Sequence, residues 1–596
     1  MKKILVLIFS FLLMSPVFAQ QPRPEYPCPQ FERTEWINLN GTWSYSFDFG
    51  NSGKSRKFEE SKGFDNKIVV PFCPESKLSG VEYKDFINCM WYHREITVPV
   101  NWSGKNMILH FGAVYYMTEV YVDGQFVGRH YGGTSSFEFD ITHFVTPGKE
   151  ANLVVYVADD LRSGVQGGGK QCFNYYSEGC SYTRVTGIWQ TVWMEAVSPC
   201  GLKQVHMVPD IDQKQLVITP SFYKESNTNM LKIVLKDKGK VVAEKSVKTS
   251  NSAVCVLPVA GLKTWSPESP FLYDVELTVL DAKNQVLDNV KSYVGMRKVH
   301  IDGNRIYLNN KPYYQRLVLD QGFYPDGIWT APSDKALKHD IEMSMQAGFN
   351  GARLHQKIFE DRFHYWADKL GYLVWAESSS WGLDANNEVA ARNFIAEWCE
   401  NVVRERNHPS IVTWTPFNET WTPSQEQYPR FVQDIYNLTK AIDPTRPIND
   451  ASGDTHVVTD IWTVHNYEGN PEKLAQALSP DKEGRLFTNY TAHPFQIYSG
   501  QPYLIDEFGG MMWNPNHDKN QPAWGYGESP KEPDDFYNRL EGLVDAILKL
   551  DNVWGYCYTQ LTDVEQERNG IYYYDRTPKF DLKKIHSIFS KVPQQK

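Results

Sequence analysis

The sequence of 596 residues lacks several features that would assign it to common functional classes. No apolar run reaches the roughly 18 residues of a membrane-spanning helix, so we expect no membrane anchor. No basic stripe stands out, and the formal net charge of −10 argues against nucleic acid as a partner. No CxxC pair or His-rich cluster has zinc spacing, so no structural metal is implied. We also expect no required metal and no cofactor.

The first 19 residues have the pattern of a secretory signal. Two lysines precede an apolar run at 4–14, and the small-residue exit ends at Ala19, where we expect cleavage. No cysteine follows at once to carry a lipid. These features predict an exported bacterial protein, periplasmic or secreted.

Cysteines are few for an exported chain, and their number, nine, is odd. They cannot all form disulfides within the chain. Cys172 and Cys180, eight residues apart, are the best local pair, and buried free thiols are the equal alternative.

Short apolar runs separated by turns fill the first half of the chain. Residues 20–197 predict a β-sandwich, with Asp123-Gly124 as a tight hairpin turn. Residues 198–298 repeat the rhythm over the length of an immunoglobulin-like sandwich. Aromatic residues make up 14%, which suits sugar-binding platforms and large β-sheet cores equally.

From residue 299 to 596 the pattern changes to strands that alternate with longer helical segments. Eight strand candidates predict a (β/α)8 barrel, whose active site lies at the carboxyl ends of its strands. The predicted strands are 313–319, 349–354, 372–377, 411–417, 447–450, 461–466, 503–507 and 553–558. The predicted helices include 334–347, 359–370, 389–406, 428–442 and 535–550.

Two glutamates follow apolar strand candidates on this predicted barrel. Glu419 comes after the fourth strand and Glu507 ends the seventh, so both should lie at the same mouth. A retaining glycosidase needs one carboxyl group as proton donor and a second as nucleophile, about 5 to 5.5 Å apart. Burial and repulsion by Glu507 should raise the pKa of Glu419.

Several motifs in order resemble glycoside hydrolase family 2, the exo-acting β-galactosidases, β-glucuronidases and β-mannosidases. The resemblance covers nearly the whole mature chain and implies that residues 20–197 form a jelly-roll sugar-binding domain. It also implies that Glu419 is the acid/base and Glu507 the nucleophile. The motifs are Leu39–Trp43, Val70–Ser76, Trp91–Arg94, Gly187–Trp193, Arg406–Ile411 and the pair Asn418-Glu419.

The resemblance implies further roles near the two acids. Asn418 should hold the sugar 2-hydroxyl, and Tyr467 should hydrogen-bond the nucleophile; a turn residue and a buried structural Tyr are the alternatives. Arg353 could brace Glu507 or form an ordinary salt bridge. Asp320 is a candidate hydroxyl acceptor or a turn cap.

The remaining candidates have less defined roles. Glu377, after the third strand, would position ligand or pack within the barrel. His355, His465 and Gln560 are candidate sugar contacts. Tyr558 would provide an aromatic platform or simply pack.

The expected substrate is a terminal sugar of plant or algal glycans, and β-galactosidase is the first choice of activity. Glucuronides rank second, because the lysine of the family's Asn-x-Lys element is absent from Glu567-Arg568-Asn569-Gly570-Ile571. The same residues also suit a β-mannosidase, a furanosidase or a non-catalytic glycan-binding protein. The sequence is also compatible with a homo-oligomer.

Overall fold

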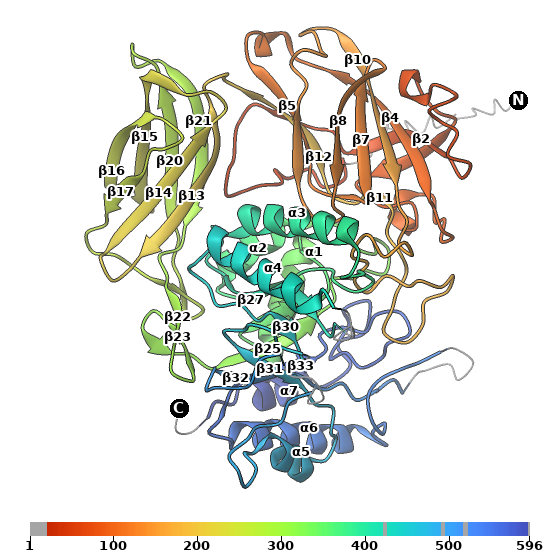
Figure 1. The fold of residues 1–596 in the computed structure, drawn as a ribbon, viewed down its shortest axis with the longest axis vertical. Helices are drawn as coiled ribbons and strands as arrows, with labels where there is room; N and C mark the ends of the chain where they lie inside the picture. The colour runs from red at the N-terminus through yellow and green to blue at the C-terminus, as the bar shows by residue number, and fades with distance from the viewer. Residues whose placement is uncertain (1–20, 421–425, 454, 490–494, 516–521, 594–596) are drawn as a thin grey trace, which may run out of the picture.

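The computed structural model of the protein describes residues 21–420, 426–453, 455–489, 495–515 and 522–593. Two β-sandwiches lie side by side above a barrel, in chain order from red through yellow to blue (Figure 1). The predicted signal segment lies outside the described residues.

The first sandwich consists of a six-stranded and a four-stranded antiparallel sheet. Its hairpin turns where the sequence predicts it, since Asp123 and Gly124 both have positive φ, 48° and 78°. The apolar faces of the two sheets pack on each other around Trp43 and Tyr92. The larger sheet has the order β3 (Asn66–Val70), β2 (Gly41–Phe47), β4 (Cys89–Thr97), β10 (Glu150–Ala158), β7 (Met117–Val122), β8 (Gln125–Tyr131), and the smaller has β1 (Trp36–Asn38), β12 (Val192–Val197), β5 (Asn106–Phe111), β9 (Phe137–Asp140).

The second sandwich is smaller and shows the alternation of a half-buried strand. Burial alternates residue by residue along β14 (Gln215–Phe222) and β20 (Tyr273–Leu280), so one face of each strand enters the core. One sheet has the order β13 (Leu202–Asp210), β14, β17 (Cys255–Pro258), and the other has β16 (Lys240–Thr249), β15 (Ser226–Asp237), β20, β21 (Val286–Val294).

Parallel strands form the barrel beneath both sandwiches (Figure 1). All residues of these strands are buried except Arg316 of β25, as expected of a parallel sheet that helices cover on the outside. The seven-stranded order is β28 (Ile411–Thr415), β27 (Leu373–Glu377), β26 (Gly351–Leu354), β25 (Gln315–Asp320), β33 (Val553–Thr559), β32 (Tyr503–Gly509), β31 (Trp462–His465).

The predicted fifth strand, 447–450, is not a regular strand. Pro447 has no N–H, and the N–H of Ile448 is taken by the side chain of Asp460 at 2.8 Å instead of a strand carbonyl. A single bridge between Trp414 and Ile448 remains, and the pair β29 (Phe417–Asn418) and β30 (Ala451–Ser452) continues it. The gap in the sheet is thus filled by irregular parallel pairing beside the site.

Helices follow the barrel strands at the predicted places. Ser333 caps the first helix through the N–H of Ala336, and Gly348, at φ 105°, ends it. The helices are α1 (Asp334–Ala347), α2 (Asp361–Leu370), α3 (Glu388–Glu405), α4 (Tyr428–Ile442), α5 (Pro471–Leu478), α6 (Pro533–Leu548) and α7 (Leu582–Phe589). Among the described helices, none is both long and apolar enough to cross a membrane.

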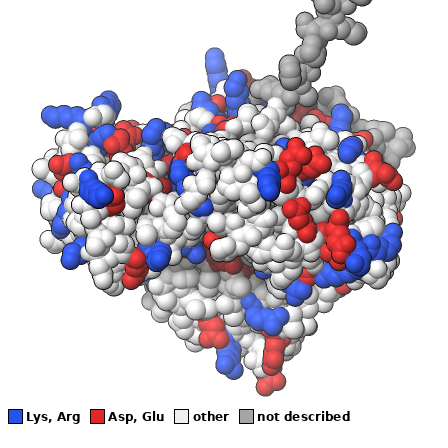
Figure 2. Space-filling model, turned by 90° about the horizontal axis from the view of Figure 1, so that it is seen from above, with Lys and Arg blue, Asp and Glu red and all other residues white. Residues whose placement is uncertain are grey.

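All nine cysteines are free thiols, so the structure does not form the Cys172–Cys180 pair. The Cys172 thiol instead donates to the carbonyl of Tyr176. On the face seen in Figure 2, acidic and basic side chains are interspersed, with broad uncharged areas between them.

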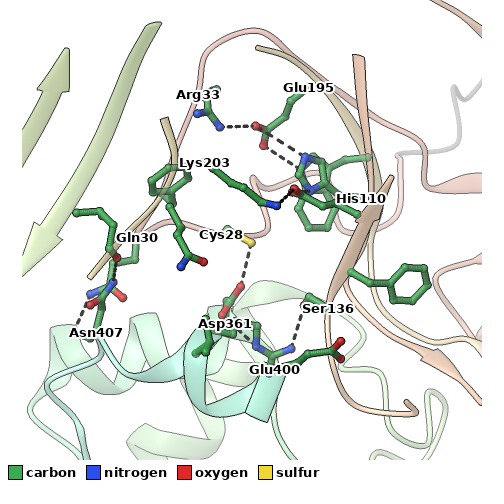
Figure 3. Close-up of a pocket in the computed structure, with 18 of the residues that line it drawn as sticks. Cys28, Gln30, Arg33, His110, Ser136, Glu195, Lys203, Asp361, Glu400 and Asn407 are labelled. Carbon is green, nitrogen blue, oxygen red and sulfur yellow. Dashed lines mark hydrogen bonds and ion pairs between the residues drawn. The ribbon is translucent and has the colours of Figure 1, made fainter. Parts of the chain in front are cut away.

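A cavity of about 440 Å³ lies where the two sandwiches meet the barrel (Figure 3). Its walls include Arg33, which bonds Glu195 of the first sandwich at 3.0 Å and Asp288 of the second at 2.9 Å. The Cys28 thiol donates to Asp361 of α2 across the same cavity. None of the site residues predicted from the sequence lines it, so the cavity belongs to the domain junction.

Replacing Arg33 should destabilise this junction. The substitution Arg33→Met leaves two buried carboxylates without their cation, which costs about 3 to 5 kcal/mol. The measurement is the free energy of the first unfolding transition in urea. Arg485→Met is the control and should change little, because it removes two ion pairs of an arginine whose side chain is 73% exposed. An unchanged transition in Arg33→Met would contradict the assignment.

Candidate active site

Arg353, at the end of β26, is the centre of the predicted site. Its side chain has no exposed surface, and its guanidinium donates to the carboxylates of Glu377, at 2.5 Å, and Glu507. A third bond reaches the Asn418 side-chain oxygen at 3.1 Å. One rigid fork therefore fixes three side chains from three different strands, β27, β29 and β32.

Glu507, on β32, has both carboxylate oxygens occupied by donors. Arg353 bonds one oxygen, and the Tyr467 hydroxyl donates to the other. Tyr467 is itself held by a stacked contact with Tyr526 and a hydrogen bond of 3.2 Å to Thr559. The carboxylate is thereby fixed in position with its side chain only 4% exposed.

Glu419 lies opposite, just after β29, in an unusual backbone conformation. Its φ is 41°, in the left-handed region that a non-glycine residue seldom adopts, and its N–H donates to the Ser452 carbonyl at 3.0 Å. Such conformations cluster at functional sites. The Glu419 side chain is 20% exposed, so it is the more accessible of the two acids.

His465, at the end of β31, lies between the two acids. Its Nδ1 is 2.6 Å from a Glu419 oxygen and 3.5 Å from a Glu507 oxygen. Its Nε2 faces the Ser452 hydroxyl at 3.1 Å and Asp506 at 3.4 Å. One carboxylate oxygen of Glu419 and one of Glu507 lie within 4.8 Å of each other.

Charge around His465 determines the protonation of this group. Burial opposes a charged imidazole, but the carboxylates of Glu507, Asp506 and Glu419 outweigh it and raise the pKa of His465 to about 9. Burial alone would raise the pKa of Glu419; the charged His465 overcomes this, and that pKa lies below its usual value. The expectation of a raised Glu419 pKa is therefore wrong for the free protein.

The nucleophile candidate is also kept ionised. Burial and the charge of Glu419 raise the pKa of Glu507, while His465 and Arg353 lower it, and the net result is a pKa below the usual range. Glu377 differs, because burial outweighs Arg353 and leaves its pKa raised. A carboxylate that is fixed, ionised and open on one side can act as a nucleophile.

Two further predicted residues adjoin this centre. His355 lies 2.9 Å from Glu377 and 3.2 Å from Arg353. The amide nitrogen of Asn418 is buried and has no hydrogen-bond partner among the described residues. That unused donor, beside Glu419, is available to a ligand oxygen.

Gln560 and Asp320 lie in adjoining networks. Gln560 accepts from Gln321 at 2.9 Å and donates to Asn569 at 2.7 Å. Asp320 accepts from the Gly322 N–H at 2.9 Å, as the turn-cap alternative predicts, and burial raises its pKa to about 6.

The structure places Tyr558 away from the barrel mouth. Its fully buried ring packs against Phe349 and Phe589 in the core between the barrel and its helices. Successive residues of a strand point to opposite faces, so Thr559 reaches Tyr467 while Tyr558 faces outward. The packing alternative for Tyr558 is the one that the structure supports.

Sequence reasoning missed a contribution from the first sandwich. The segment 159–186, between β10 and β11 (Gly187–Ile188), extends onto the barrel mouth, where Gly168 donates to the Trp381 carbonyl at 2.6 Å. It places Lys170 over the Trp381 ring, 3.8 Å from its centroid. The three consecutive glycines 167–169 were the available signal, because they permit such close approach.

Two groups of side chains have spacings that a metal ion could use. Glu419, His465 and Glu507 form the first, and Asp361, Glu405 and His408 the second. In the first, the short His465–Glu419 hydrogen bond already uses the central atoms. In the second, Arg404 pairs with Glu405 and lies 3.6 Å from Asp361, so a cation is already present.

Comparison with protein families matches three successive parts of the chain. Residues 37–166 match the sugar binding domain of glycosyl hydrolases family 2, and 201–297 match a second domain of that family. Residues 299–593 match the family's TIM barrel domain. The chain belongs to glycosyl hydrolase family 2. The three-part architecture predicted from the sequence, two sandwiches and a (β/α)8 barrel, is confirmed.

Relatives within family 2 have two activities in their names. A β-galactosidase of Thermoanaerobacter pseudethanolicus is 26% identical over 79% of this chain, which spans 63% of that protein's length. A β-glucuronidase of Paenibacillus borealis is 24% identical over 93% of this chain and 97% of its own. The solved structure of a β-glucuronidase from Ruminococcus gnavus with D-glucuronic acid has a TM-score of 0.78 at 20% identity, covering 95% of this chain and 100% of that chain.

The charge on His465 should be visible in the pH dependence of stability. Its folded pKa of about 9 exceeds the ordinary 6.5, so its contribution is complete below pH 6.5 and is lost as pH rises through 9. The melting-temperature gap between wild type and His465→Asn should therefore narrow between pH 7 and 9.5. His206→Asn is the control, because burial lowers that pKa to about 4 and its contribution is constant above pH 6.5. A gap that stays constant or widens for His465→Asn would show that the imidazole is uncharged.

Proposed function

We propose that the protein is a retaining exo-β-glycosidase that works through a covalent glycosyl-enzyme intermediate. The observation that carries this proposal is the approach of Glu419 and Glu507 to within 4.8 Å. Retaining enzymes hold their carboxyl groups about 5 to 5.5 Å apart, whereas inverting enzymes need about 6.5 to 9.5 Å to admit a water. The segment 159–186 across the mouth favours a terminal sugar over an internal one.

In the first step, Glu507 attacks the anomeric carbon and the bond to the leaving oxygen breaks. Glu419 delivers a proton to that oxygen. The proton is available in the hydrogen bond of 2.6 Å between Glu419 and His465, which together hold it. Arg353 and Tyr467 keep Glu507 oriented until it forms the ester.

In the second step, Glu419 removes a proton from water, and the resulting hydroxide attacks the anomeric carbon. The ester bond to Glu507 breaks, and the sugar leaves with its original configuration. The unused amide donor of Asn418 is available to the sugar 2-hydroxyl, a contact that strengthens as charge develops on the ring.

For the sugar itself we propose a β-glucuronide as the first candidate, which reverses the order expected from the sequence. The relative with the more complete coverage is a β-glucuronidase, and a β-glucuronidase structure superposes along almost the whole chain. A β-galactoside is the second candidate. It is supported by the β-galactosidase relative and by Glu567, an acid in the stretch that lacks the expected lysine.

We also propose that the protein acts outside the cytoplasm, in the periplasm or beyond, on glycan fragments. The support is the signal pattern at 1–19. Fractionation of the bacterium that produces it, with detection of the protein lacking residues 1–19, tests this proposal.

A panel of p-nitrophenyl β-glycosides tests the activity and ranks the sugars. We expect release of nitrophenol, with kcat/KM for the glucuronide at least about tenfold above that for the galactoside, glucoside and mannoside. NMR of the first product should show the β-anomer. No turnover on any glycoside would refute the enzyme, and a preferred galactoside would refute only the choice of sugar.

Loss of either acid should abolish most turnover. Glu507→Ala removes the nucleophile, and Glu419→Gln removes the acid/base; each should lower kcat by about 10³-fold or more. With Glu507→Ala, added azide should restore turnover and give a glycosyl azide of inverted configuration. The matched control is Glu483→Gln, an exposed acid outside the site, which should leave the rate unchanged. Near-normal activity in either site variant would refute its role.

Tyr467→Phe should shift the pH profile upward on its acidic side. The hydroxyl donates to Glu507, and removing a donor from a carboxylate raises its pKa. Glu507 must be ionised to attack, so the acid limb of kcat/KM should move to higher pH. Tyr176→Phe, which changes an exposed tyrosine, is the control. An acid limb that stays in place would mean that Tyr467 does not tune Glu507.

A further inference from the structure

Lys170 is a buried cation without a partner. The residue is 6% exposed, and its ammonium forms no hydrogen bond or ion pair with any residue that the structure describes. The nitrogen lies over the Trp381 ring, 3.8 Å from the ring centroid. An ammonium carries three hydrogen-bond donors, and here none of them has an acceptor among the described residues, so they are available to a ligand.

The backbone around Lys170 is tightly fixed to the barrel. A Cβ on Gly167 would lie 1.9 Å from the Ser379 carbonyl oxygen, and one on Gly169 would lie 2.3 Å from that of Gln356. The Tyr182 N–H donates to the Lys170 carbonyl at 2.7 Å. Lys170 therefore has a defined place at the mouth, although it comes from the first sandwich.

That place adjoins the reacting groups. The ring under Lys170, Trp381, donates its indole N–H to the Asn418 carbonyl at 3.0 Å, one residue before Glu419. On the other side, Glu567 accepts from Tyr182 of the same segment and from Asn569 at 2.9 Å. Lys170 thus belongs to a wall that connects the catalytic strand end with the stretch in which the sequence lacks a lysine.

The ammonium is charged in this setting. Burial lowers the pKa of Lys170, but Cys180 and the carboxylates of Glu567, Glu419 and Glu507 outweigh burial and leave it raised. Yet none of these carboxylates pairs with it directly. Both Glu567 oxygens are already used by Tyr182 and Asn569. A site with a charged donor that has no acceptor favours a ligand that carries an anionic hydrogen-bond acceptor.

We propose that Lys170 is a specificity-determining residue that binds the carboxylate of a β-hexuronoside, supplying from the first sandwich the cation that the barrel sequence lacks. This inference rests on the proposed glycosidase activity. Lys170 donates a charge-assisted hydrogen bond to the sugar carboxylate while Trp381 supports its aliphatic stem and ammonium. The carboxylate replaces the missing partner of the buried ammonium.

The test compares two substrates that differ only at C6, p-nitrophenyl β-glucuronide and p-nitrophenyl β-glucoside. In Lys170→Met, we expect kcat/KM for the glucuronide to fall by about 100-fold, mostly through KM, and that for the glucoside to change less than about threefold. Lys170→Arg should recover most of the glucuronide activity because it keeps the charge. Lys149→Met, an exposed lysine of the same domain, is the matched control and should leave both values unchanged.

Each outcome decides between the proposals. An equal loss on both substrates, or a failure of Lys170→Arg to recover activity, would show that Lys170 only supports the fold of the mouth and would overturn the inference. An unchanged glucuronide to glucoside ratio would overturn it too. A wild-type protein that cleaves only neutral glycosides would refute both the proposed glucuronide substrate and the proposed role of Lys170. The proposed glycosidase activity would still stand. Melting temperatures of all variants, measured alongside, separate loss of fold from loss of binding.

Discussion

The bond between Arg353 and its three acceptors is the constraint on which the site depends. A guanidinium with no exposed surface is stable only if acceptors surround it, and here these are Glu377, Glu507 and Asn418. Each acceptor comes from a different strand end, so satisfying the buried charge also fixes their mutual distances. The same bonds of Arg353 therefore stabilise the barrel mouth and set the geometry of the site.

His465 divides the remaining charge unequally between the two acids. Its Nδ1 is 2.6 Å from Glu419 and 3.5 Å from Glu507, and the latter also has Arg353. The proton of the site is thus shared on the Glu419 side, which is also the more exposed side. Three carboxylates, of Glu507, Asp506 and Glu419, keep His465 charged. The charged imidazole in turn lowers the pKa of Glu419 by more than burial raises it.

Sequence reasoning predicted the features of the site that depend only on where strands end. It failed for features that depend on contacts between side chains of separate segments. Glu419 and Glu507 follow apolar strand runs, so their common mouth was predictable. The lowered Glu419 pKa was not, since it depends on the orientation of the His465 ring. Tyr558 needed the alternation of strand faces, and the irregular fifth strand needed the knowledge that Asp460 takes the N–H of Ile448.

Lys170 was beyond sequence reasoning for a different reason, because it lies 249 residues before Glu419 and 337 before Glu507, in a domain predicted to be separate. Its segment packs its glycines against barrel carbonyls, so domain boundaries drawn from strand rhythm do not bound the site. The charged groups of the site are likewise divided between the barrel and the first sandwich. The barrel strand ends hold the carboxylates and the cations that position them, whereas the only cation left without a partner among the described residues of the mouth comes from the sandwich. Because Lys170 forms no bond with Arg353 or His465, binding of a sugar carboxylate to it leaves both of those side chains in place, and this separates the choice of sugar from the chemistry performed on it.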